Sequence, residues 1–121
     1  MFMALDRAQE ALDAARVCLE AGLYHSATNR AYYAMFWAAQ AALAHAGIRR
    51  AEWSHAGLQA SFIRELIRMR KQYSALLGQH LNRALQLRLD ADYRPKGVSQ
   101  RQATQAVSWA QAFVTAVMEA I

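Results

Sequence analysis

The run over residues 31–39, Ala-Tyr-Tyr-Ala-Met-Phe-Trp-Ala-Ala, is apolar at every position. A helix over this run has no polar face to turn toward water, so something must enclose it on all sides. Its alanines allow other helices to approach closely, and its four aromatic side chains supply bulk. The run therefore predicts a central buried helix, enclosed by neighbouring helices or by a second copy of the molecule.

A membrane span is the other structure that an apolar run can form. This run continues past Gln40 to Ala46, but it is rich in alanine, carries His45, and is barely long enough to cross a bilayer. We therefore expect no membrane span. At the N-terminus, Asp6, Arg7 and Glu10 interrupt any apolar core that a secretory signal would need.

The rest of the chain favours helices. Apolar residues recur at steps of three and four, and five glycines and one proline in 121 residues are few. The first expected helix covers about residues 4–21. The second begins near Ser26 or Thr28, either of which can cap it, and runs to Gly47. Two more cover about residues 55–71 and 74–89, and the last begins at a capping box formed by Ser99 and Gln102. Residues 48–54 and 90–97 are expected connections. We predict an all-α fold: one domain over residues 1–121, an antiparallel bundle of about five helices.

Several chemistries have no residues to support them. Cys18 is the one cysteine, so neither an internal disulfide nor a paired-cysteine zinc site can form, which is typical of a reducing, cytoplasmic protein. The chain has no glycine-rich phosphate loop. We expect no metal and no cofactor, because no two of the histidines share a helix face: His25, His45, His55 and His80.

Positive charge is concentrated in the second half of the chain. The net charge is +5, yet residues 1–48 carry three arginines against four acidic side chains. Residues 49–101 carry eleven basic side chains, nine of them arginine, against four acidic ones. Such a surface attracts polyanions, and guanidinium groups suit phosphate. Alternatively, these arginines only solvate two helix faces and pair with nearby acids.

Three groups of polar residues are candidate sites. The first is Asn29, Arg30 and Tyr33 at the start of the central helix, where they either form hydrogen bonds within the chain or face a groove. The second, around His55, is described below.

The third is the segment 88–94, where Asp92 is expected to accept hydrogen bonds and Tyr93 to pack beneath it. This corner is expected to hold the last helix against the second. On the fourth helix, Arg83 and Arg88 are expected to be exposed.

The second group places Arg49 and Arg50 close in sequence to His55. An imidazole can accept or give a proton near neutral pH, and arginine can stabilise the charge that grows on a phosphoryl group. Together they are the minimum set for metal-free cleavage of RNA, in which the 2′-hydroxyl attacks the neighbouring phosphate. The alternative is that His55 simply caps the third helix.

Three strings together resemble the HEPN family: the run from Asn29 to Phe36, His55-Ala-Gly57, and the segment from Arg88 to Tyr93. The resemblance implies a helical bundle that dimerises and is often encoded beside a minimal nucleotidyltransferase as a toxin–antitoxin pair. Many HEPN proteins are metal-independent endoribonucleases whose motif is an arginine, four to six residues, then a histidine. Arg50 and Arg49 stand four and five residues before His55, so both fit that spacing.

Two functions follow and stay open at this point. In the first, a cytoplasmic homodimer binds RNA or nucleotide through the candidate residues and the basic helices, where Arg64 and Arg68 point away from the core. If it cleaves, His55 acts as general base or acid and Arg50 stabilises the transition state. In the second, the chain is a non-catalytic module that docks a nucleotidyltransferase partner through interfaces that include Tyr32, Phe36 and Trp37.

Overall fold

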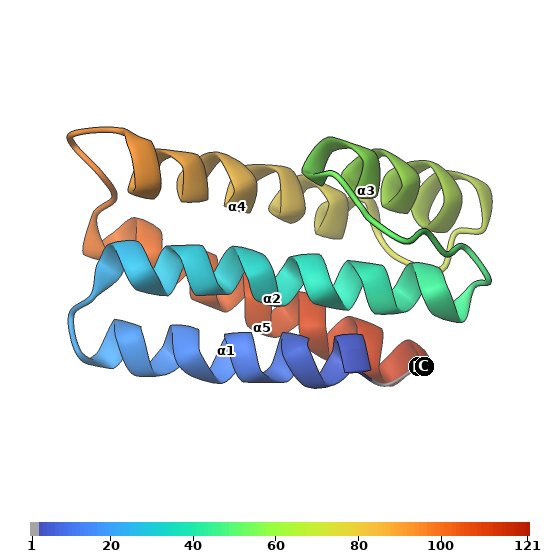
Figure 1. Cartoon of the computed structure of the whole chain (residues 1–121), viewed down its shortest axis with the longest axis horizontal. Helices are drawn as coiled ribbons and strands as arrows, with labels where there is room; N and C mark the ends of the chain where they lie inside the picture. Colours follow the sequence, from blue (N-terminus) through green and yellow to red (C-terminus); the bar gives the residue numbers. More distant parts are fainter. Residues whose placement is uncertain (1–2) are drawn as a thin grey trace.

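The computed structural model describes residues 3–121 and is built of helices joined by turns and short extended segments (Figure 1). No strand occurs among these residues, so the prediction of an all-α bundle of five helices is confirmed. An eight-residue π-helix, η1, continues the third helix. The elements are α1 (Met3–Glu20), α2 (Tyr24–His45), α3 (His55–Ser61), η1 (Phe62–Met69), α4 (Ala75–Tyr93) and α5 (Gln100–Ala120).

α2 is the central helix of the bundle and packs against every other element (Figure 1). α1 and α4 run antiparallel to it on two sides, and α5 lies behind it. The connection after α2 turns back along that helix before α3 begins, so α3 and η1 run in the same direction as α2 beside its second half. This returning segment, predicted as the connection over residues 48–54, brings the first residue of α3 against the middle of α2.

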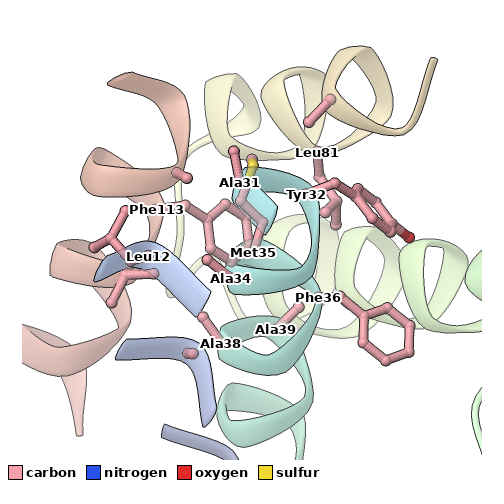
Figure 2. Packing of buried hydrophobic residues seen from close by; sticks show 14 of the residues in the cluster. Leu12, Ala31, Tyr32, Ala34, Met35, Phe36, Ala38, Ala39, Leu81 and Phe113 are labelled. Carbon is pink, nitrogen blue, oxygen red and sulfur yellow. The ribbon is translucent and has the colours of Figure 1, made fainter. Parts of the chain in front are cut away.

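The apolar run is enclosed by the chain's own helices, as Figure 2 shows. Ala31, Tyr32 and Met35 are fully buried, and Phe36 is 7% exposed. One stripe of α2 reaches solvent in part, at Tyr33, Trp37 and Gln40. The prediction of a central buried helix is confirmed, and its enclosure does not require a second copy. None of the helices over residues 3–121 is long and apolar enough to span a bilayer.

Most helix ends follow from the residues predicted there. Ser99 Oγ accepts a hydrogen bond from Gln102 N (3.1 Å) while Ser99 N donates to Gln102 Oε1 (2.9 Å), which confirms the capping box. Gly22 and Gly47 follow α1 and α2 with φ of +76° and +85°, the left-handed conformation that glycine tolerates best.

The predicted start of α2 was wrong. The helix begins at Tyr24, so neither Ser26 nor Thr28 is its cap. The Thr28 hydroxyl instead donates to the Tyr24 carbonyl oxygen at 2.9 Å, a bond made inside the first turn of the helix.

The predicted end of α4 was also wrong. The helix continues to Tyr93, because Asp90 pairs with Arg94 (2.8 Å) and Arg88 with Asp92 (3.2 Å), one turn apart on the helix surface. Pro95 then forces Arg94 out of the helical region, to a ψ of 136°. Tyr93 is 72% exposed, so the expectation that it packs beneath Asp92 was wrong as well.

The third predicted helix is present, but its second part is a π-helix. Leu58, Phe62 and Leu66 are buried, as predicted. The wide turns bring the side chains of Ile63 and Ile67 over Gly78 of α4, where a Cβ atom would lie 3.2 and 3.0 Å from them. Arg64 and Arg68 are left on the exposed side.

Candidate functional site

His55 is the first residue of α3 and lies half-buried against α2. It is not the helix cap: Ser54 takes that position, and its Oγ accepts a hydrogen bond from Gly57 N at 3.0 Å. Three rings of α2 surround the imidazole, those of Tyr32, Tyr33 and Phe36, with centroids 5.4, 6.0 and 5.2 Å away. The sequence-predicted histidine therefore sits in an aromatic surround on the central helix.

The Tyr32 hydroxyl holds one ring nitrogen of His55. Its Oη lies 2.7 Å from His55 Nδ1, and the Tyr32 side chain is fully buried. Burial raises the pKa of the Tyr32 hydroxyl far above its ordinary value, so the hydroxyl keeps its proton. Donation to Nδ1 is the arrangement that satisfies this buried O–H, and it leaves the proton of a neutral imidazole on Nε2.

Arg88 of α4 is the charged residue that acts on the pKa of His55. Its side chain is only 14% exposed, so the prediction that it is exposed was wrong. α4 packs antiparallel on α2, and the guanidinium lies 5.4 Å from the centre of the Tyr33 ring. Burial, and secondly the charge of Arg88, lower the pKa of the His55 imidazole below its ordinary value. His55 is therefore neutral at pH 7.

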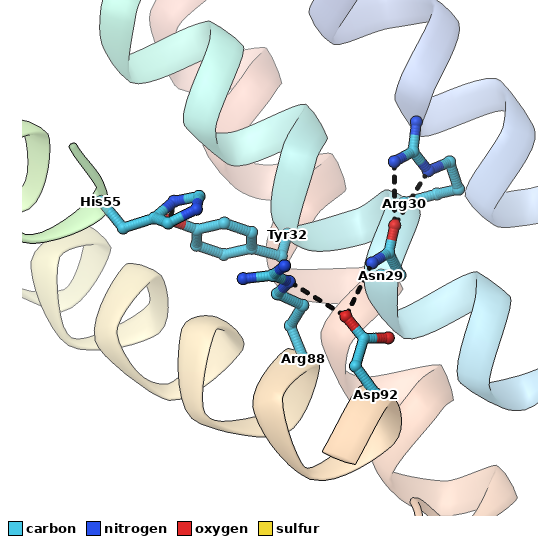
Figure 3. Close-up of polar contacts among 6 residues, drawn as sticks. All are labelled: Asn29, Arg30, Tyr32, His55, Arg88 and Asp92. Atoms are coloured by element: carbon cyan, nitrogen blue, oxygen red, sulfur yellow. Dashed lines mark hydrogen bonds and ion pairs between the residues drawn. The ribbon is translucent and has the colours of Figure 1, made fainter. Parts of the chain in front are cut away.

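Asp92 joins α4 to the start of α2 (Figure 3). Its Oδ2 accepts a hydrogen bond from Asn29 Nδ2 (3.1 Å) and forms the ion pair with Arg88 Nε. Arg30 Nε and Nη2 donate to Asn29 Oδ1 at 3.1 and 2.8 Å. Asp92 accepts hydrogen bonds as predicted, but the corner that it makes ties α4, and not the last helix, to α2.

The polar group on α2 fulfils both alternatives that the sequence left open. Asn29 and Arg30 form the hydrogen bonds described, and they also line a surface hollow of about 360 Å³ together with Cys18 and His25. Tyr33 has a guanidinium over its ring from Arg30 as well, at 5.0 Å, in addition to that of Arg88. The Tyr33 ring beside His55 is thus contacted by two guanidinium groups.

The spacing of Arg49 and Arg50 in the sequence suggests that they lie beside His55, but Arg50 contacts Trp53 instead. Both are exposed in the extended connection, and the Arg50 guanidinium lies over the Trp53 ring at 4.7 Å. Arg50 thus contacts the ring of Trp53, while the guanidinium whose charge acts on His55 comes from α4.

Arg64 and Arg68 lie on the exposed side of η1. Arg64 pairs with its neighbour Glu65 at 3.2 Å, and Arg68 has no ion pair within residues 3–121. Neither is part of the His55 surround. The sequence-predicted residues therefore divide into a polar site, with Asn29, Arg30, Tyr33 and His55, and a basic rim, with Arg49, Arg50, Arg64 and Arg68.

Sequence reasoning missed Tyr32 and Arg88 as members of the site. The signal for Arg88 was present, since Asp92 follows it at the spacing of one helical turn. Nothing in the sequence pairs Tyr32 with His55, because 23 residues separate them. Tyr32 and Phe36 are buried in the bundle and therefore cannot serve an external interface; of the three aromatic residues assigned to one, only Trp37 is partly exposed.

The residues of the site can transfer a proton and bind an anion. The described part of the chain contains no group of three or more His, Cys, Asp or Glu side chains that could hold a metal ion. A neutral imidazole can accept a proton, or donate a hydrogen bond from Nε2, and the adjacent guanidinium favours a negative group.

Comparison with known proteins gives the same family as the sequence strings. A family model described as "HEPN domain" matches residues 3–121. The chain belongs to the HEPN family. This HEPN chain is 38% identical over 87 residues to a "UPF0332 protein" of Thermotoga maritima, a match that covers 72% of the chain and 64% of that protein. It is 30% identical over 118 residues to "Putative toxin MJ0605" of Methanocaldococcus jannaschii, with 97% and 85% covered.

Proposed function

We propose that this HEPN chain is the RNA-binding toxin component of a toxin–antitoxin pair, acting in the cytoplasm as a homodimer with a minimal nucleotidyltransferase as its antitoxin partner. The observation that carries the proposal is the half-buried His55, held by Tyr32 beside the guanidinium of Arg88 (Figure 3), in a chain that also exposes the arginines of the basic rim. The family match and a relative whose name calls it a toxin support the biological role.

The basic rim supplies the attraction for RNA. Arg49, Arg50 and Arg68 are exposed and have no ion pair within the described residues, so their charges are open to phosphate. Binding of this kind weakens steeply as salt concentration rises. The reason is that binding releases cations from the nucleic acid, and this release becomes less favourable when the solution already contains more of them. A free mononucleotide makes fewer such contacts, so we favour RNA over a nucleotide as the ligand.

Metal-independent cleavage is the reaction that this site supports. The 2′-hydroxyl oxygen forms a bond to the neighbouring phosphorus while His55 takes its proton. The bond from phosphorus to the 5′-oxygen breaks, and this oxygen takes a proton from the imidazolium so formed or from water, giving a 2′,3′-cyclic phosphate and a 5′-hydroxyl end. The lowered pKa of His55 keeps the imidazole neutral, as a general base must be. The resting imidazole carries its proton on Nε2, so His55 acts as base from Nε2 only after a tautomer exchange that moves this proton to Nδ1, which then donates to Tyr32 Oη.

The test is incubation of end-labelled RNA with the protein in EDTA. Parent protein is expected to bind the RNA and to release fragments with cyclic phosphate ends, and His55→Ala to lose cleavage while RNA binding persists. Equal cleavage by His55→Ala and the parent would show that the histidine is not the proton-transfer group.

The competing function is docking of a nucleotidyltransferase without catalysis, for which the exposed arginines offer a surface to an acidic partner. RNA binding by the isolated chain that falls with salt favours the first function. A chain that binds the partner enzyme but no RNA at low salt favours docking. The homodimer has its own measurement: light scattering at micromolar concentration is expected to give twice the mass of one chain.

A further inference from the structure

Arg88 is a largely buried cation whose charge is only partly compensated. Its side chain is 14% exposed, and a guanidinium removed from water needs strong partners. The one acid near it, Asp92, pairs with Nε at 3.2 Å and is shared with Asn29. That pair is not aligned as a hydrogen bond, since the buried Nε is left without a hydrogen-bond partner. The guanidinium therefore has donors to spare.

Arg88 and His55 lie against the same aromatic ring. The Arg88 guanidinium is 5.4 Å and the His55 ring 6.0 Å from the centroid of Tyr33, which is half-buried and so opens to solvent. Figure 3 shows the Arg88 guanidinium between the Tyr32–His55 pair on one side and Asp92 on the other. Since Tyr32 holds Nδ1, the free donor of the neutral imidazole is Nε2–H. Donors from α3 and α4 thus converge beside one ring.

Resting on the RNA-binding function above, we propose that one backbone phosphate of the RNA binds between His55 Nε2 and the guanidinium of Arg88, beside the ring of Tyr33. The cation of this site is then supplied by α4 and not by Arg50. A phosphate accepts several charge-assisted hydrogen bonds at once, and the planar guanidinium presents two parallel donors to it. The partial pairing with Asp92 orients Arg88 without neutralising it.

Arg50 is less suited to this position. It is exposed, and its guanidinium stacks on Trp53 in the extended connection, where water and salt screen its charge. Its contribution is to the long-range attraction of RNA along the rim. Arg30, at 5.0 Å from the Tyr33 centroid, is the second guanidinium on the ring, and its bonds to Asn29 Oδ1 hold it at the side facing α1.

The test measures, by anisotropy in EDTA, the affinity of a fluorescein-labelled single-stranded RNA dodecamer whose 2′-hydroxyls are methylated, so that it cannot be cleaved during the titration. Arg88→Gln is compared with Arg83→Gln, an exposed arginine on the same helix, so that both variants lose one positive charge. Arg88→Gln is expected to weaken binding about tenfold, the scale of one lost charge-assisted pair, and Arg83→Gln about twofold. Arg88→Lys keeps the charge without the planar fork, serves if the glutamine variant fails to fold, and is expected to weaken binding about threefold.

Asp92→Asn separates phosphate binding from a merely structural role. It removes the negative charge but keeps an amide oxygen that can still accept from Arg88 and orient it, so we expect RNA binding that equals or exceeds that of the parent. Weakening by Asp92→Asn as large as that by Arg88→Gln would show that Arg88 only fastens α4 to α2, and would overturn the inference.

Two further outcomes distinguish this inference from the function on which it rests. Equal weakening by Arg88→Gln and Arg83→Gln, or a larger loss with Arg50→Gln than with Arg88→Gln, would overturn the phosphate site while RNA binding stands. Absence of RNA binding by the parent protein at low salt would overturn both.

Discussion

At the scale of single residues, the hydrogen bond from Tyr32 Oη to His55 Nδ1 fixes the candidate site. It joins a fully buried side chain of α2 to the first residue of α3 across a separation of 23 residues. The bond does two things: it satisfies a buried hydroxyl, and it decides which imidazole nitrogen faces outward. Both consequences can be measured independently of any RNA.

Tyr32→Phe keeps the ring and removes the hydroxyl. We expect a loss of about 1–2 kcal/mol in the free energy of unfolding, because Nδ1 loses its donor in a partly desolvated place. In ¹H–¹⁵N correlation spectra, the parent is expected to show His55 with its proton on Nε2, and the variant a mixture of tautomers. Tyr24→Phe is the matched control, since no hydrogen bond from its hydroxyl ties two helices. An unchanged tautomer in Tyr32→Phe would contradict the assigned bond.

The pH dependence of stability follows from the same residue and from His80. Burial lowers the pKa of both imidazoles, aided by Arg88 for His55 and by Arg83 for His80. In the unfolded chain each has its ordinary pKa of 6.5 and takes up a proton first as pH falls. Their contribution to stability is therefore complete above that pH and is lost as pH falls through the lowered folded-state values.

Urea unfolding at about pH 7.5 and about pH 5 measures this effect. The parent is expected to be less stable at the lower pH, and His55→Gln to show a smaller difference between the two. A difference equally large in His55→Gln would assign the pH dependence to other groups.

The chemistry of the site was predictable from the sequence only in part. Asn29, Arg30 and Tyr33 were identified because polar groups stand out at the start of a largely apolar helix, and His55 because two arginines stand shortly before it in the sequence. Arg88 was assigned to solvent, because helical spacing alone does not show that its face is turned toward α2. The packing of α4 on α2 places Arg88 beside His55 (Figure 3). The sequence favoured Arg50, because it stands only a few residues before His55.

At the scale of elements, turns and caps set the ends of the helices. Where side chain and backbone bond locally, as at Ser99, the sequence predicts the end correctly. The sequence predicts the end of α4 wrongly, because ion pairs extend the helix toward Pro95 and Gly97, which favour a loop. It also does not predict the π-helical turns of η1, which pack on Gly78. Those ends depend on contacts made after the helices meet.

The capping box at α5 is expected to contribute measurably to stability. Ser99→Ala removes the oxygen that accepts from Gln102 N, at a cost of about 1 kcal/mol in the free energy of unfolding. Ser108→Ala, on the exposed face of the same helix, is the control and is expected to change stability by less than about 0.5 kcal/mol. Equal effects of the two substitutions would show that the box is not formed in solution.

Gly97 and Gly47 form a second matched pair. Both have positive φ, +63° and +85°, but a Cβ at Gly97 would collide with the His25 ring, whereas one at Gly47 meets nothing within 4 Å. Gly47→Ala is expected to cost about 1 kcal/mol from backbone strain alone, and Gly97→Ala at least about 1 kcal/mol more. Thermal unfolding of both variants gives the comparison, and equal costs would contradict the contact between the α4–α5 turn and the start of α2.

At the scale of the whole molecule, the bundle buries the central run of α2 and leaves its arginines exposed, with the exception of Arg88. The central run of α2 allowed this to be predicted, since an apolar helix must be enclosed. The direction of α3 and η1 differs from the antiparallel arrangement predicted for neighbouring helices: the connection over residues 48–54 turns back along α2, so α3 and η1 pack beside the second half of α2 and run parallel to it.

The basic rim predicts a strong dependence of RNA affinity on salt. Arg64→Gln/Arg68→Gln is expected to weaken binding to all sequences alike and to reduce the slope of log affinity against log salt by about 2. The control, Arg16→Gln/Arg101→Gln, removes the same charge from α1 and α5 and is expected to leave that slope nearly unchanged. Equal slopes for the two double variants would show that η1 does not face the RNA.

The most direct measurement is an NMR titration of histidine-labelled protein, in EDTA, with single-stranded RNA whose 2′-hydroxyls are methylated so that it is not cleaved. The chain has four histidines at separate places. His25 lies in the hollow beside Asn29, His45 at the end of α2, His55 at the start of α3, and His80 on α4, stacked on Trp109 of α5. We predict that the His55 resonances shift as RNA is added while those of His45 and His80 stay in place. Shifts confined to His45 or His80, with His55 unmoved, would contradict the account.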